Sequence, residues 1–192
     1  MDVYEFENSI CELIKIEEID KAIELTEVEL LKIPKNDFHK IIGRNLFHLI
    51  DDANEFLNAV FEKSTEEIVN VKSIYCEMNG FTINPDLWFV MGMSFTFCND
   101  LTDTDWLADY DYFFEMALVI EGYEDLQKIY EDYVQNEKWE YEDSAELCAI
   151  IITLRLLELF RETYKRFKDK SEWTKIPVFV TSHDSELIFK TK

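Results

Sequence analysis

The segment Asp100 to Asp111, DLTDTDWLADYD, holds the densest group of side chains in the chain that could do chemistry. Carboxylates at short spacing can bind a metal ion, can act as an acid and base pair, or can attract cationic side chains of another protein. An indole and a phenol among them would add rigid contact area to a recognition surface. The side chains concerned are Asp100, Asp103, Asp105, Trp106, Asp109, Tyr110 and Asp111.

A calcium-binding loop is the first possibility, and the spacing argues against it. Counted from Asp100 or from Asp103, the sixth residue is not glycine and the twelfth is not glutamate, so the sharp turn and bidentate ligand of an EF-hand are missing. The histidines have no ligand spacing, and GxSxG, GxGxxG and Walker motifs are absent from the sequence. Acid and base catalysis would need a cleft and a perturbed environment. We expect no metal site, no cofactor and no catalytic residue, and hence no enzyme.

A docking surface for a basic protein is the interpretation favoured for this segment. Trp106 has two compatible roles open to it, as an exposed anchor for the partner or as a core residue that fastens the loop. A second acidic and aromatic run, EKWEYEDSAE, extends from Glu137 to Glu146 and adds Glu140 and Glu142 to the candidate partner-binding residues. The two runs could together form one negative face. The second run is also explained as an ordinary helix connection that ends in a capping residue.

The first third of the chain shows helical spacing of apolar residues. Pro34 ends this part, Asp37 is expected to cap a further helix, and residues 53–61 carry another helical stripe. After Gly122 the helical period returns. A long helix capped by Asp143 or Ser144 is then expected, with basic residues in its last turns.

Strand signals lie between these helical parts and at the end of the chain. IVNVKSIYCEM is followed by Asn79-Gly80, a pair that favours a hairpin turn, and then by FTI. The apolar run from Leu87 to Cys98 predicts a central strand buried on both faces. Tyr112 to Ile120 predicts a further strand, with a helix as the alternative, and IPVFV and ELIF predict two short ones. The pattern is that of an α+β fold. We predict one domain over residues 1–192, in which N-terminal helices and two long helices pack on a mostly antiparallel sheet of about four to six strands.

Net charge points to the class of partner. The chain of 192 residues carries a formal charge of −22, although residues 155–192 hold nine basic and only six acidic residues, so the negative excess lies in the first 154. Such a charge repels nucleic acid and anionic lipid and attracts basic protein surfaces. The four cysteines lie apart within apolar segments, which predicts buried free thiols. An acidic N-terminus and the lack of a long apolar run predict a cytoplasmic protein with no membrane partner.

Three stretches, MNGFTINPDLWFVMGMSF, DTDWLADYD and VIEGYEDLQKIYEDY, carry a resemblance to a known class of proteins. Over about residues 75–135 the chain resembles the acidic immunity-type proteins that accompany bacterial polymorphic and contact-dependent toxins. The resemblance implies a small cytosolic α+β protein that inhibits one toxin, often a nuclease, by covering its active site with acidic residues. The N-terminal helices and the long helix after Ser144 lie outside it.

Three functions therefore stay open at the level of sequence. The first is an immunity protein that neutralises a basic toxin domain. The second is a mimic of nucleic acid or another acidic interaction module, which needs carboxylates spaced along one face. The third is an enzyme that uses carboxylates, which needs a cleft around the aspartates.

Overall fold

A computed structural model describes residues 3–191 of the chain. Five α-helices and five strands, joined by short 3-10 turns, make up this part of the protein. The helices are α1 (Val3–Lys15), α2 (Ile19–Lys32), α3 (Ile50–Glu67), α4 (Glu124–Gln135) and α5 (Glu142–Phe167), and the strands are β1 (Ser73–Met78), β2 (Phe89–Phe95), β3 (Tyr112–Val119), β4 (Val178–Ser182) and β5 (Phe189–Lys190).

The five strands form one sheet in the order β3-β2-β1-β4-β5. All neighbours are antiparallel except β1 and β4, which run parallel. The predicted α+β fold with a mostly antiparallel sheet is confirmed. Residues 112–119 form a strand, so the helical alternative is wrong, and β2 lies inside the sheet as its apolar sequence predicts.

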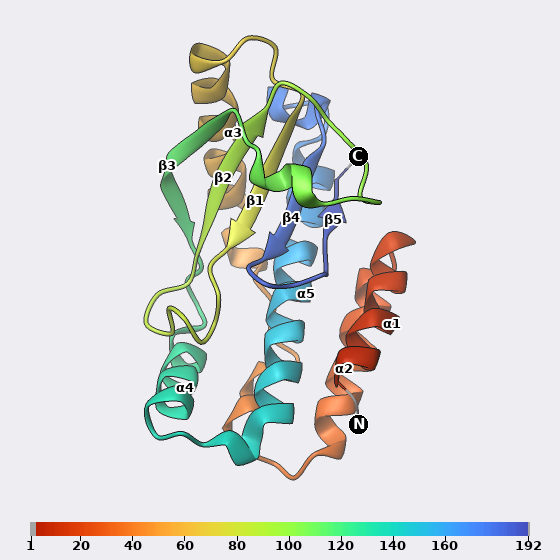
Figure 1. The fold of residues 1–192 in the computed structure, drawn as a ribbon, viewed down its shortest axis with the longest axis vertical. Coiled ribbons are helices and arrows are strands. Elements are labelled where there is room, and N and C mark those ends of the chain that lie inside the picture. The colour runs from red at the N-terminus through yellow and green to blue at the C-terminus, as the bar shows by residue number, and fades with distance from the viewer. Residues whose placement is uncertain (1–2, 192) are drawn as a thin grey trace.

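Helices α3 and α5 cover one face of the sheet (Figure 1). Ser64 of α3 donates a hydrogen bond to Ser94 of β2 over 2.7 Å, and the hydroxyls of Thr153 in α5 and Ser182 in β4 lie 2.7 Å apart. Gly92 of β2 allows the close approach of α3, because a Cβ there would lie 2.7 Å from a side-chain atom of that helix. We call the opposite side of the sheet the open face.

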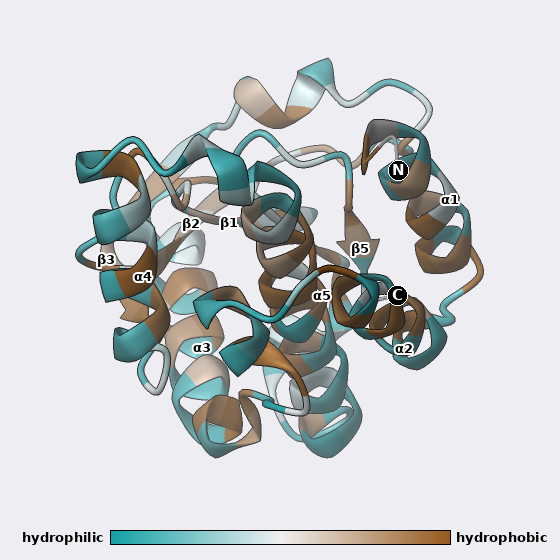
Figure 2. Ribbon diagram, turned by 90° about the horizontal axis from the view of Figure 1, so that it is seen from below, coloured by the Kyte–Doolittle hydropathy of each residue, from teal (hydrophilic) through white to brown (hydrophobic). Residues whose placement is uncertain are grey.

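Helix α5 lies at the centre of the helical part, with α1 and α2 on one side and α4 on the other (Figure 2). It is hydrophobic around most of its circumference, as a helix enclosed by neighbours must be. Helix α4 packs mainly against the 3-10 helix η1 (Asp37–Ile41), where the rings of Tyr130 and Phe38 lie 5.1 Å apart.

The turn chemistry predicted for Asn79-Gly80 is wrong, although β1 and β2 do form a hairpin. Neither residue has a positive φ, the connection extends over residues 79–88, and the FTI segment lies in a turn. The Asn79 side chain closes this loop instead. It accepts a hydrogen bond from the Phe89 backbone N–H and donates one to the Leu87 carbonyl, both over 2.8 Å.

Two predicted helix caps are also wrong. Helix α5 begins after Tyr141 with no side-chain cap, and the Ser144 hydroxyl accepts a hydrogen bond from Asn36 over 2.8 Å. Asn36, not Asp37, caps the segment that follows it, and that segment is the short η1 rather than a long helix. Tertiary hydrogen bonding of Ser144 outweighs its local capping preference.

The thiols only partly match the prediction. Cys76 and Cys148 are buried, Cys11 is half-buried and Cys98 is exposed, so the prediction is wrong for Cys98. All four are free. No helix within residues 3–191 has the length and apolar content needed to cross a membrane.

Candidate functional site

Trp106 fastens the acidic segment to the open face. Its side chain is only 8% exposed, and its ring centroid lies 5.0 Å from that of Phe95 in β2 and 5.2 Å from that of Phe179 in β4. The indole N–H donates a hydrogen bond to the Asp100 carbonyl over 3.1 Å. Of the two roles open to Trp106, the structure therefore assigns that of a core residue. Its burial excludes the role of an exposed anchor.

The aspartates around Trp106 are exposed, and three of them also shape the loop. Asp111 accepts hydrogen bonds from the Thr96 backbone N–H (2.6 Å) and hydroxyl (2.9 Å). Asp100 accepts from the N–H and hydroxyl of Thr102, and these bonds lower the pKa of its carboxyl. Asp103 accepts from the Asp105 N–H over 3.0 Å. The loop thus presents carboxylates from a backbone held in place by Asx turns and by the buried indole.

The open face beside this loop has an apolar centre. Met91, Met93, Phe113, Tyr110 and Ile83 contribute to a hollow of about 340 Å³, which we call the central hollow. Tyr110 and Phe113 are partly exposed, and their rings lie 5.9 Å apart. Rigid aromatic and flexible methionine side chains of this kind suit a protein contact.

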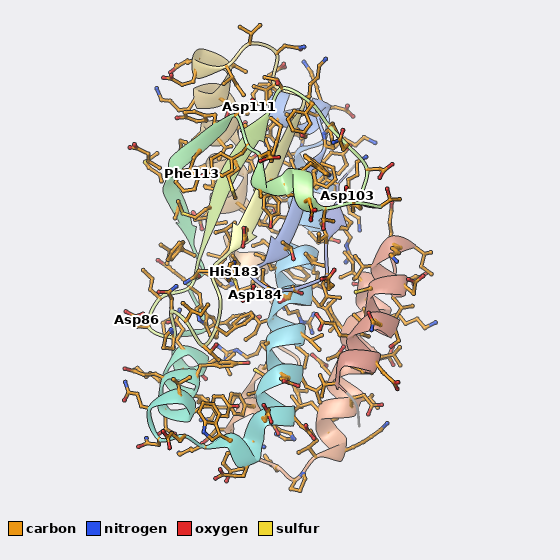
Figure 3. All side chains as sticks on the ribbon, viewed as in Figure 1. Asp86, Asp103, Asp111, Phe113, His183 and Asp184 are labelled. Atoms are coloured by element: carbon orange, nitrogen blue, oxygen red, sulfur yellow. The ribbon has the colours of Figure 1, made fainter. Side chains whose placement is uncertain are left out.

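His183 lies beside the central hollow, just after β4. Its backbone N–H donates to the Met78 carbonyl over 2.8 Å, which places the ring next to β1. The ring Nδ1 lies 2.6 Å from a Glu77 carboxylate oxygen, and Nε2 lies 3.6 Å from Asp184. The hydrogen bond to Glu77 raises the pKa of His183 above its usual value of 6.5. Figure 3 shows His183 and Asp184 together below the loop that carries Asp103.

We expect replacement of Glu77 by glutamine to lower the pKa of His183, measured by NMR titration of the ring. Asp184→Asn is the control, since the longer contact should give a smaller decrease. Because the pKa of His183 is raised in the folded chain, its pairing with Glu77 stabilises the fold fully at pH values below the pKa of this histidine in the unfolded chain. The contribution disappears as the pH rises through the pKa of His183 in the folded chain. An unchanged His183 titration in Glu77→Gln would contradict the hydrogen bond.

The acidic residues line a series of neighbouring hollows. One of about 450 Å³ is bordered by Asp100 and Asp103, and one of about 470 Å³ includes Glu77, Asp105 and Glu186. A larger groove of about 720 Å³ runs beside α5. The carboxylates that line these hollows and the groove are Glu7, Glu77, Asp100, Asp103, Asp105, Glu142, Glu146, Asp184 and Glu186, and no lysine or arginine lines any of the four.

The residues singled out from sequence are only partly brought together. Asp109, Asp111 and Glu140 do not line these hollows. The second acidic run begins α5 at the opposite end of the long axis from η3 (Asp105–Ala108), so the two runs do not form one continuous face (Figure 1). Carboxylates from other elements lie between them, and Asp184 borders both the groove and the hollow of Asp105.

Sequence reasoning missed Glu77 and His183, which line the central hollow. Glu77 and His183 are 106 positions apart and meet because β1 and β4 pair. No local pattern marks either residue. Within residues 3–191 no three His, Cys, Asp or Glu side chains gather in an arrangement that could hold a metal ion.

Comparison with known proteins found no matching family model, no matching curated protein and no matching solved structure.

Proposed function

We propose that this chain is an acidic binding protein that captures a basic protein on the open face of its sheet, and that the partner is a toxin domain which it neutralises. The observation that carries the proposal is the composition of the three hollows outside the α5 groove: six carboxylates and no lysine or arginine line them. A positively charged surface is the complement of such a lining.

The rest of the molecule compensates this negative charge only in part: Lys190 lies near enough to Asp100 to help lower the pKa of its carboxyl. Most lysine and arginine side chains already pair within the fold, for example Arg161 with Asp20 at 2.7 Å and Lys63 with Glu66 at 2.7 Å. The formal charge of −22 therefore acts on approaching cations and anions. Association with a basic partner should be fast, and anionic competitors should be repelled.

The apolar centre of the open face should affect how fast the complex dissociates. Desolvation of Tyr110 and Phe113 against a partner would slow dissociation, whereas the acidic rim would accelerate association. A nuclease domain fits this surface because its cleft binds phosphates with basic side chains. Carboxylates of the loop would then occupy the positions of the phosphates.

The test of the proposal is binding to a basic toxin domain encoded beside this chain, followed by stopped-flow kinetics. The association rate constant should fall by about tenfold or more between about 0.05 M and 0.5 M salt, because screening removes the long-range attraction. Toxin activity should fall in parallel with complex formation. A neighbouring basic domain that neither binds nor loses activity would overturn the proposal.

The triple variant Asp103→Asn, Asp105→Asn, Asp109→Asn should associate about tenfold more slowly with that domain while its free energy of unfolding stays within about 1 kcal/mol. Asparagine keeps the side-chain oxygen that accepts the Asp105 N–H. The matched control is Asp52→Asn, Glu55→Gln, Glu62→Gln, three exposed residues of α3 behind the sheet. Equal slowing in both variants would mean that net charge, rather than this surface, directs the encounter.

A further inference from the structure

The groove beside α5 has a lining that differs from the rest of the surface. Small and apolar residues of α5, among them Ala145 and Ala149, border it, together with residues of α1, of α4, of the 80–83 turn and of the turn after β4. Its volume of about 720 Å³ lies in the range of small-molecule pockets.

Four carboxylates reach this groove from three separate elements. Glu7 comes from α1, Glu142 and Glu146 from the first turns of α5, and Asp184 from the turn after β4. The Ser185 hydroxyl donates a hydrogen bond to Glu7 over 3.3 Å. Burial raises the pKa values of Glu7 and Glu146, and neighbouring carboxylates raise them further. No lysine or arginine contributes to either shift.

Aromatic rings form another part of the lining. Trp139 is 53% exposed, whereas Trp88, Trp106 and Trp173 are buried. Its ring lies edge-on to that of Tyr133, with centroids 5.1 Å apart. An indole ring that is half exposed and lies beside carboxylates can bind ammonium groups and the methylenes next to them.

We propose that this groove binds a linear aliphatic polyamine, with its ammonium groups beside Glu7, Glu146 and Asp184 and its methylene chain against Trp139 and Tyr133. The carboxylates supply charge at several points along the groove, which suits a chain of separated cations. A metal ion would use only the carboxylates and would gain nothing from the indole.

A free polyamine fits this lining better than a peptide. An extended peptide carries backbone amide groups that need hydrogen-bond partners along their whole length. Helices α1, α4 and α5 provide much of the groove, and the backbone groups in the interior of each helix are already paired within it. A polyamine has no such requirement. The inference does not depend on the proposed toxin partner. Asp184 borders both the groove and the hollow of Asp105, but Glu7, Glu146 and Trp139 line only the groove.

Spermidine is the probe, titrated into the whole chain with calorimetry and tryptophan fluorescence as readouts. We expect saturable binding, a change in the emission of Trp139, and loss of that change in Trp139→Phe. The double variant Glu7→Gln, Glu146→Gln should bind about tenfold or more weakly. Each single variant gives the same test if the double variant does not fold.

The matched control is Glu55→Gln, Glu62→Gln on α3, which removes the same charge far from the groove and should bind spermidine as the natural chain does. Equal weakening of spermidine binding in both double variants would mean that spermidine binds only as a diffuse counterion, and it would overturn the proposal. Tighter binding of an oligolysine peptide that displaces spermidine would also overturn it, because the occupant would then be a protein segment.

Discussion

Replacement of Phe95 by alanine is expected to lower the free energy of unfolding by about 3 to 5 kcal/mol. The side chain is fully buried on the open face of β2. Its ring lies 5.0 Å from that of Trp106 and 5.5 Å from that of Phe97. Truncation would leave a cavity under the acidic loop, because the sheet backbone cannot close over it. Urea unfolding followed by circular dichroism measures the difference.

Phe113→Ala is the control for this change. Phe113 is on the same face of the neighbouring strand, but 39% of it is exposed, so less apolar area is lost and we expect a decrease of about 1 kcal/mol or less. Phe95→Ala should in addition loosen the loop, visible as faster amide exchange around Trp106. Equal destabilisation by the two substitutions would contradict the anchoring role of Phe95.

Replacement of Arg155 by methionine is the second change with a large expected effect, a decrease in the free energy of unfolding of about 3 to 5 kcal/mol. The Arg155 side chain is 12% exposed. Its guanidinium joins α5 to α2 through Glu27, at 2.9 Å, and a second nitrogen lies 2.9 Å from Glu158. Methionine would leave two carboxylates in a largely enclosed site without a counter-charge. Chemical unfolding at neutral pH measures the effect.

Arg166→Met is the matched control, since Arg166 forms a single ion pair, of 3.1 Å with Asp51, and both side chains are more than half exposed. We expect its effect to be below about 1 kcal/mol. The double variant Arg155→Met, Glu158→Met should recover part of the stability lost in Arg155→Met, because one of the uncompensated carboxylates is removed with its partner. Similar losses for Arg155→Met and Arg166→Met would show that the buried ion pairs do not hold α2 against α5.

Local patterns predicted most of the elements. The helical spacing of residues 53–61 lies within α3, and the apolar run from Leu87 to Cys98 contains β2. Such patterns work because each element buries one face, and the period of its apolar residues follows from its own geometry. Turns and caps were predicted less well. Asn79 and Ser144 have strong local preferences, yet both make other hydrogen bonds in the folded chain.

The acidic loop was visible in the sequence, but the role of its tryptophan was not. Tryptophan is a residue type common at binding hot spots, but Trp106 has the environment of a core residue. Phe95 and Phe179 contact it from two different strands. Exposure depends on what lies opposite a side chain. That information is absent from the dozen residues around Trp106.

By itself the sequence determined the secondary structure class, the order of helices and strands, and the excess of negative charge, since each is a property of composition or of short-range spacing. Only the tertiary structure decided where that charge converges. The parallel pairing of β1 with β4 places Glu77 against His183, and the packing of α1 beside α5 places Glu7 and Glu146 along one groove. Contacts between residues more than a hundred positions apart depend on the packing of whole elements, and no local spacing encodes them.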